Sequence, residues 1–218
     1  MNDRSVKGSM ISGNPAKELI IFAIPMILGN LFQQFYNIAD SVIVGKFLGP
    51  DALAAVGASN SITTLFVMVA IGTGIGCSVI ISQLFGAGRM KDVKSSISTA
   101  LIAIFAFSLI LSTIGFMLSG NILKWMHTPS DVYEEADKYL KIYFLGFAFL
   151  FMYNAFNAVF NALGDSAKPL VFLIFSSVLN IGLDILFVWK FGWGVAGAAW
   201  ATLIAQAVSA IISFIVLI

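Results

Sequence analysis

The sequence contains few charged residues. Asp, Glu, Lys and Arg make up 11% of its 218 residues, whereas an ordinary soluble domain has about 25%. Hydrophobic residues account for 59% of the chain, and its mean hydropathy is +0.96. This balance excludes a soluble globular domain and indicates an integral membrane protein.

Cysteine and histidine each occur only once. Cys77 falls inside an apolar run, so it can form neither an internal disulfide nor a structural zinc cage, and we expect it to be a packing residue. His127 stands beside a Thr-Pro turn with no ligands near it in sequence, so we expect a surface residue and not a base or a metal ligand. The net charge of +1, without a basic patch, gives no support for a nucleic-acid partner.

Six apolar runs follow one another along the chain, each long enough to cross a bilayer as a helix. The runs are continuous and do not alternate, which favours helices over barrel strands. They lie at about 19–44, 52–84, 97–118, 139–163, 169–189 and 195–218. The predicted fold class is therefore an all-α integral membrane protein, a six-transmembrane-helix bundle over 19–218 that follows a cytoplasmic N-terminal segment at 1–18. The polar stretch 120–138 is predicted to be the longest connection.

Glycine, proline and tryptophan mark other features of the predicted spans. Pro25 lacks a backbone donor and is expected to bend the first helix, and Pro50 suits the first turn of the second. The glycines at 72, 74 and 76 have no preceding strand, so we expect close helix packing or a flexible point there instead of a nucleotide loop. Trp189, Lys190 and Trp193 resemble interfacial anchors.

The polar residues inside the apolar runs are arranged in stripes. Asn30, Gln33, Gln34, Asn37 and Asp40 recur at three- and four-residue steps in the first run, beside Tyr36. The fourth run has Tyr139, Tyr143, Asn154, Asn157 and Asn161 along one stripe, and the sixth has Thr202, Gln206, Ser209 and Ser213. Such stripes indicate either a hydrated cavity or hydrogen bonds that hold helices together.

Asn180 and Asp184 form the strongest polar signal. They stand at i and i+4 in the fifth run, so a helix projects both from one face. A lone Asp at the bilayer centre costs about 2.5 to 3.5 kcal/mol on insertion scales, so such residues usually face a partner or a wet cavity. A structural hydrogen bond between two helices is the simpler alternative.

An even number of spans places both termini on the same side of the membrane. The positive-inside rule makes that side the cytoplasm. The residues that support this orientation are Arg4, Lys7, Lys17, Arg89, Lys91, Lys94 and Lys168; Lys46, Lys124, Lys138 and Lys190 fall on the opposite side.

A series of short motifs resembles the multidrug and toxic compound extrusion (MATE) transporters. In chain order they are Gly13-Asn-Pro15, Pro25-Met-Ile-Leu-Gly-Asn30, Tyr36-Asn-Ile-Ala-Asp40, Val44-Gly, Gly49, Ala52-Leu-Ala-Ala-Val-Gly57, Gly72-Thr-Gly-Ile-Gly76, Gly164-Asp-Ser and Gly194-Val-Ala-Gly-Ala-Ala-Trp-Ala-Thr202. The resemblance implies a cell-membrane transporter of two six-helix lobes, which exports cationic amphipathic compounds against inward sodium or proton flow. This chain would be the N-terminal lobe, and a fragment of a longer protein is the expected explanation.

The resemblance also assigns roles to residues. In the DinF-like branch, an N-terminal-lobe cation or proton site maps onto Asp40, Asn180, Asp184 and Thr202, with sodium as the metal that the site would hold. The substrate-cavity candidates are Gln33, Gln34, Tyr36, Asn37, Tyr139, Asn154 and Asn157. Beyond the coupling ion, no cofactor is expected; the partners are the substrates, the bilayer and a second lobe.

The hypothetical mechanism begins with repulsion between the two acids. Two carboxylates in low dielectric repel each other, so one should be protonated or a cation should lie between them. Asp40, Asp184, the Asn180 carbonyl and the Thr202 hydroxyl offer only oxygen ligands, which suit a hard cation. Ion loading would change helix packing and release the substrate by competition.

Three rival functions remain. A lipid-linked precursor flippase of the same superfamily should have a more cationic cavity, to meet a pyrophosphate. An intramembrane aspartyl protease would use Asp40 and Asp184 as its dyad, but its motifs are absent because Ala39 precedes Asp40 and Ile181 replaces a glycine. The third rival, a purely structural membrane subunit, leaves the polar stripes unexplained.

Overall fold

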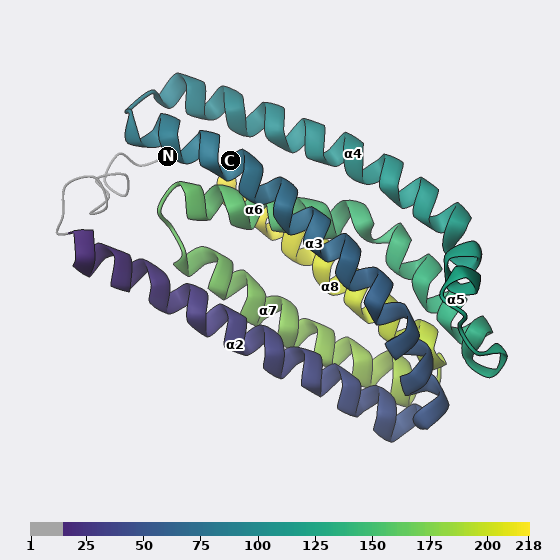
Figure 1. The fold of residues 1–218 in the computed structure, drawn as a ribbon. Coiled ribbons are helices and arrows are strands. Elements are labelled where there is room, and N and C mark those ends of the chain that lie inside the picture. Colours follow the sequence, from purple (N-terminus) through teal and green to yellow (C-terminus); the bar gives the residue numbers. More distant parts are fainter. Residues whose placement is uncertain (1–14) are drawn as a thin grey trace.

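The computed structural model describes residues 15–218, which form a bundle of helices (Figure 1). Arg4, Lys7, Gly13 and most of the expected N-terminal segment lie outside the described residues. The helices in chain order are α2 (Pro15–Leu48), α3 (Pro50–Gly86), α4 (Met90–Trp125), α5 (Ser130–Leu145), α6 (Phe147–Ala162), α7 (Ala167–Asp184), the π-helical turn η1 (Ile185–Lys190) and α8 (Gly194–Leu217). Among the described residues five helices are long and apolar enough to cross a membrane, and α5 with α6 makes a sixth if the bent pair is one span. The predicted all-α membrane fold is therefore confirmed.

The fourth apolar run, 139–163, is divided between two helices. Helices α5 and α6 meet at Gly146 with a bend of 52°. A Cβ atom added at Gly146 would lie 3.0 Å from Leu203 Cγ, so Leu203 of α8 packs directly against the break. Hydropathy detects both halves but not the bend.

The prediction of a long connection over 120–138 is wrong. Helix α4 continues to Trp125 and α5 begins at Ser130, which leaves only residues 126–129 between them. Two hydrogen bonds join the polar ends of these helices. Ser119 Oγ donates to Asp137 Oδ1 at 2.7 Å, and Tyr133 Oη donates to the Gly120 carbonyl at 3.0 Å. Hydropathy identifies only the part of a helix that is apolar enough to lie within the bilayer. Helices α4 and α5 extend beyond that part.

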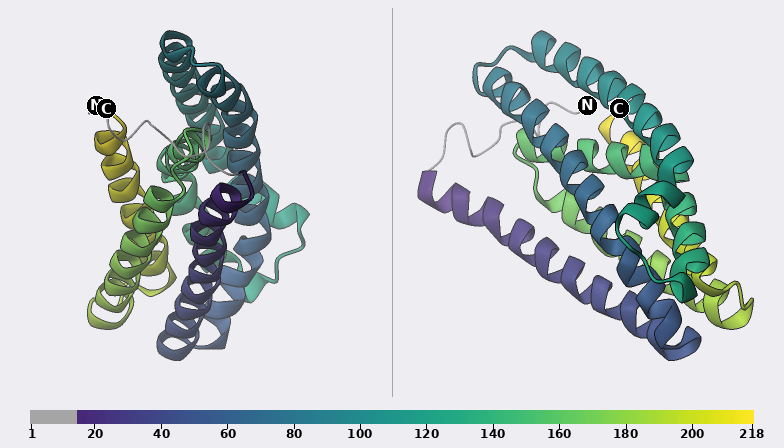
Figure 2. Two further views of the ribbon diagram at one scale, coloured as in Figure 1. Left: turned by 90° about the vertical axis from the view of Figure 1, so that its left-hand side faces the viewer. Right: turned by 45° about the vertical axis from the view of Figure 1, so that its right-hand side comes forward.

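The connections alternate between the two ends of the bundle (Figures 1 and 2). The turns at 87–89 and 163–166 lie at one end, together with the start of α2 and the end of α8; we call this the Arg89 end. The connections at 49, 126–129 and 191–193 lie at the other, which we call the His127 end. His127 is exposed there, as predicted.

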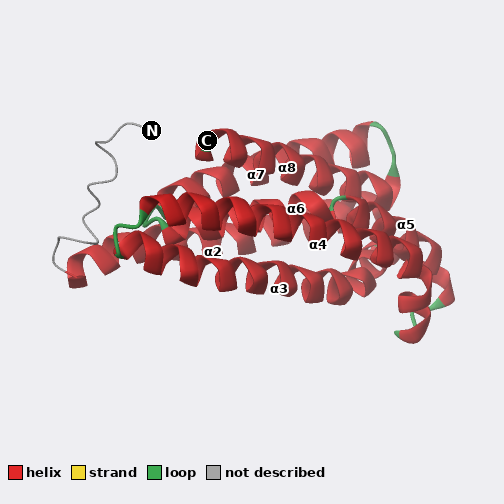
Figure 3. Cartoon of the chain, turned by 90° about the horizontal axis from the view of Figure 1, so that it is seen from above, coloured by secondary structure: helices red, strands yellow, loops and turns green. Residues whose placement is uncertain are grey.

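Seen from above, most of the helices are long and nearly aligned (Figure 3). Their main apolar core lies between α3, α4, α5 and α6 and is rich in phenylalanine, with Phe144, Phe147 and Phe151 all fully buried. Gly74 allows α3 to approach α6, because an added Cβ would lie 3.1 Å from Ala158 Cβ. Close packing is thus confirmed at Gly74, while the positions of Gly72 and Gly76 are open.

Helix α2 completes the bundle by packing against α7 and, more loosely, α3. It continues as one helix through Pro25. On the Arg89 side of Pro25, the buried Ser166 hydroxyl from the α6–α7 turn donates to the Phe22 carbonyl at 2.8 Å. This bond fixes the start of α2 to a segment 144 residues later in the chain. Pro50 is the first residue of α3, as predicted.

Candidate functional site

Asp40 of α2 and Asp184, the last residue of α7, bring their carboxyl groups face to face. Asp184 is fully buried, and the Oδ1 atoms of both residues are buried without a hydrogen-bond partner among residues 15–218. The π-helical turn η1 starts directly after Asp184, a type of irregularity that is frequent at functional sites. The structure thus joins two acids that lie far apart in sequence.

Asn180 and Thr202 support Asp184 from behind. The amide orientation that satisfies its neighbours has the Asn180 nitrogen donating to Asp184 Oδ2 at 2.8 Å. The Asn180 oxygen then accepts from the Thr202 backbone N–H at 3.1 Å and from its hydroxyl at 3.3 Å. All four predicted ion-site residues therefore lie together, but the Asn180 carbonyl is directed at Thr202 and not at the acid pair.

Tyrosine side chains surround the acid pair. Tyr36 of α2 is an electrostatic neighbour of both acids and lies beside Thr202, and Tyr139 of α5 is also close to Asp40. The rings of Tyr139 and Tyr143 stack with their centroids 6.2 Å apart. Phenol hydroxyls and ring faces both suit a cation in front of Asp40.

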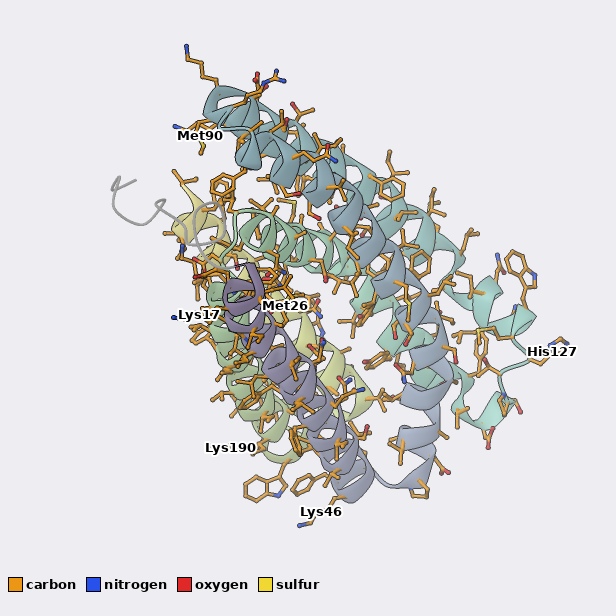
Figure 4. The ribbon with its side chains drawn as sticks, turned by 60° about the vertical axis from the view of Figure 1, so that its left-hand side comes forward. Lys17, Met26, Lys46, Met90, His127 and Lys190 are labelled. Atoms are coloured by element: carbon orange, nitrogen blue, oxygen red, sulfur yellow. The ribbon has the colours of Figure 1, made fainter. Side chains whose placement is uncertain are left out.

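A cavity of about 870 Å³ opens in front of Asp40 and is lined by residues of α2, α3, α5, α6, α7 and α8. Asp40 and Thr202 line it, while Asn180 and Asp184 lie behind its wall. All seven substrate-cavity candidates from the sequence line it as well: Gln33, Gln34, Tyr36, Asn37, Tyr139, Asn154 and Asn157. Met26, labelled in Figure 4, lies on its wall near the Arg89 end.

Among the described residues, the cavity wall carries negative charge and no positive charge. Among the described lining residues Asp40 is the single carboxylate, and lysine, arginine and histidine are absent. Aliphatic side chains such as Val67, Ile71 and Leu173 alternate with amides and hydroxyls. Such a wall favours a ligand that combines apolar surface, hydrogen-bonding groups and a positive charge.

Several amides of the α2 and α6 stripes form hydrogen bonds within their own helix. Gln33 donates to Asn37 at 3.2 Å and Asn154 donates to the Leu150 carbonyl at 2.8 Å, in each case within one helix. Asn157 and Asn161 each bury an Oδ1 atom without a partner in the described part of the chain. For these residues of α2 and α6 the geometry therefore favours cavity lining. Asn180 differs, because it forms a hydrogen bond between helices with Thr202 of α8.

Sequence reasoning did not assign every residue of the cavity wall. Tyr153 and Thr63 line the cavity, and neither was singled out. Tyr153 precedes Asn157 by four residues, so the helical spacing that identified the asparagines also included this tyrosine. Asn60 of α3 also lines the cavity, and Thr63 follows it by three residues, which places both on one face of the helix.

The donor set limits the ions that could bind. No group of three or more His, Cys, Asp and Glu side chains that could hold a metal ion occurs within residues 15–218. The acid pair instead offers two unpartnered carboxylate oxygens, which can take a proton or an oxygen-ligated monovalent cation. The chemistry of these oxygen atoms therefore fits a sodium ion as well as a proton.

Comparisons with known proteins show which family and which solved structures the chain is similar to. The MatE family model matches residues 25–186. The chain is 36% identical over 197 residues to a probable multidrug resistance protein of Bacillus subtilis, YpnP, covering 90% of this chain and 44% of that protein. The chain spans about half the length of the curated relatives that it matches.

Two solved structures superimpose closely on the bundle. One is a MOP superfamily transporter from Pyrococcus furiosus, for which a reversed polarity of the binding pocket suggests a different function; its TM-score is 0.91 at 28% identity, covering 96% of this chain and 46% of that chain. The other is an outward-facing multidrug resistance MATE transporter of the MOP superfamily, with a TM-score of 0.91 at 27% identity and the same coverage.

Proposed function

The chain belongs to the MatE family of membrane transporters, and from that premise we propose that it forms the N-terminal lobe of a secondary active multidrug efflux transporter of the DinF-like branch. Inward flow of sodium or protons drives the export of cationic amphipathic compounds. The lobe lies in the cell membrane with both termini in the cytoplasm, and a second lobe completes the transporter. The family consists of transporters and not of enzymes, so an intramembrane protease is excluded.

One observation carries the proposal: a buried acid pair borders a cavity whose described wall lacks a cationic side chain. Two facing carboxylates removed from water repel each other, so the pair is most stable with one positive charge or proton between them. Asp40 belongs to the acid pair and also lines the cavity. Its carboxylate can therefore be neutralised either by the coupling ion or by a cationic substrate. This competition is the basis of antiport.

The polarity of the cavity argues against a flippase for lipid-linked precursors. A pyrophosphate in this cavity would meet Asp40 and find no lysine or arginine among the described lining residues. Desolvating such an anion without a counter-charge is costly. The cationic substrate class is therefore the better match to this lobe.

Binding of a cationic probe to the purified chain tests the proposal. We expect Asp40→Asn to weaken the binding of tetraphenylphosphonium at least about tenfold, or about 1.4 kcal/mol, because the substitution removes the one carboxylate on the cavity wall. Equilibrium dialysis with radiolabelled probe measures the affinity. The matched control is Ser41→Ala, which changes the neighbouring wall residue without altering charge.

Sodium should compete with the probe in the native chain. Raising sodium at constant ionic strength lowers probe affinity there, and has no effect in Asp40→Asn. Equal probe affinity in the native chain and in Asp40→Asn contradicts the proposed substrate site.

A further inference from the structure

Two lysine–aromatic pairs meet at one corner of the His127 end. Lys46 and Phe47 lie near the end of α2, and Trp189 and Lys190 end η1. The rings of Phe47 and Trp189 are in contact, with centroids 6.0 Å apart, and the Lys46 ammonium lies 5.9 Å from the Phe47 ring. Figure 4 shows Lys46 and Lys190 at the same corner of the bundle. Each ring of this aromatic contact is thus followed or preceded in sequence by a lysine, Lys46 before Phe47 and Lys190 after Trp189.

Neither lysine is neutralised within the described part of the chain. Lys138 and Lys141, also near this end, form ion pairs with acids of their own helix, at 2.8 and 2.7 Å. Lys46 and Lys190 are exposed and form no such pair among residues 15–218. Asp51, the acid closest to Lys46 in sequence, is not bonded to it. The corner therefore has two positive charges available to an anion from outside.

Aromatic side chains indicate the depth of this corner in the membrane. Phe187 stacks on Trp193 with centroids 4.8 Å apart, and Trp189 and Trp193 remain 64% and 51% exposed. Exposed tryptophans at the end of a membrane helix mark the headgroup level of the bilayer. Lysine stems extend along apolar surface and hold their ammonium groups at the same level. The two charges therefore lie where lipid phosphates are found.

A groove leads away from Lys46 into the hydrocarbon region. Its volume is about 830 Å³, and its surface is mainly apolar. It runs along α2 beside Gly45, Val42 and Ile38, with Leu53 of α3 at its edge, and also includes the polar side chains of Ser41, Asn37 and Gln34. A free phosphate ion would gain nothing from contact with a mainly apolar groove, whereas a lipid acyl chain would fit it. The combination of charge, depth and groove favours a lipid over a soluble anion.

We propose that this corner binds one anionic phospholipid. The phosphodiester lies between the Lys46 and Lys190 ammonium groups, the headgroup contacts Trp189, and one acyl chain follows the groove along α2. A zwitterionic lipid gains less, because its own cationic headgroup competes for the phosphate. The site would fasten the ends of α2 and η1 to each other through a shared ligand.

Native mass spectrometry of the purified chain with added phosphatidylglycerol or phosphatidylcholine tests this site. Each lysine near the membrane surface contributes a factor of about five to the affinity for an anionic lipid, so two predict up to about a 30-fold preference for phosphatidylglycerol. The double variant Lys46→Gln/Lys190→Gln should lose the preference. Both side chains are exposed, so the melting temperature without added lipid should not change.

Lys124→Gln provides the matched control. Lys124 is also exposed, unpaired among residues 15–218 and followed by an exposed tryptophan, Trp125, but it has no second lysine across an aromatic contact. We expect this variant to retain the native preference. An unchanged preference in the double variant, or an equal loss in Lys124→Gln, overturns the proposal. Glycerol phosphate at millimolar concentration should not displace the lipid; displacement would assign the corner to soluble phosphates instead.

Discussion

At the scale of single residues, the local sequence predicted that Asp184 has a polar partner, but not that this partner is Asp40. Asp184 was conspicuous because an ionisable side chain in an apolar run, one turn from Asn180, must have a partner. Local spacing contains no information about which residue of another helix that partner is. The pairing with Asp40, 144 positions earlier, was expected only from the family resemblance, and the amide orientation of Asn180 was not predictable at all.

Ser119 is a residue whose role only the structure shows. Its buried hydroxyl donates to Asp137, whose other oxygen forms an ion pair with Lys141. We expect Ser119→Ala to destabilise the purified chain by about 1 to 3 kcal/mol, since a hydrogen bond to a charged group is lost. Chemical denaturation in mixed micelles measures the change.

The control for Ser119→Ala is Ser78→Ala. Ser78 is half-buried and its hydroxyl donates only within its own helix, to the Ile75 carbonyl. This substitution should change stability by less than about 0.5 kcal/mol. Equal effects of the two substitutions contradict a special role of the Ser119–Asp137 bond.

At the scale of helices, hydropathy located the membrane-embedded segments better than their ends. Helices α4 and α5 continue into polar sequence because Ser119, Tyr133 and Asp137 bond across them, which is a tertiary effect. The bend at Gly146 lies against Leu203 of α8, and the apolar pattern of 139–163 continues across it. Packing between helices is therefore what sequence periodicity left undetermined.

The contact between α4 and α5 at Gly115 gives a prediction at this scale. A Cβ atom added at Gly115 would overlap the Phe144 ring, which is fully buried in the main core. We expect Gly115→Ala to lower stability by about 1 to 3 kcal/mol through overpacking. The melting temperature in detergent should fall accordingly.

Gly76→Ala serves as the comparison for Gly115→Ala. Gly76 is also inside a helix, but an added Cβ there would meet open space. Alanine should be neutral or stabilising by up to about 1 kcal/mol, because it restricts the unfolded chain. If Gly115→Ala is as stable as Gly76→Ala, the packing described for α4 and α5 is incorrect.

At the scale of the whole molecule, the two ends of the bundle differ in charge. The Arg89 end carries Lys17, Arg89, Lys91, Lys94 and Lys168 against Glu18, Asp92 and Asp165. The His127 end has as many acidic as basic side chains. The excess of positive charge at the Arg89 end supports its proposed placement in the cytoplasm.

Cysteine labelling tests this orientation. In a Cys77→Ser background, Ser130→Cys places a thiol at the His127 end and Ala87→Cys places one at the Arg89 end. A membrane-impermeant maleimide should label Ser130→Cys in intact cells, and Ala87→Cys only after permeabilisation. The reverse pattern contradicts the proposed topology.

The central claim, that the acid pair binds the coupling ion, is tested most directly by thermal stability. The melting temperature of the purified chain is measured in sodium and in N-methylglucamine across pH, with Asp184→Asn alongside. An ion that binds only the folded chain stabilises it by about 2.7 kcal/mol at 100 times its Kd. We predict that sodium or acidification raises the melting temperature of the native chain and has no effect on Asp184→Asn. No response in the native chain, or the same response in the variant, contradicts the account.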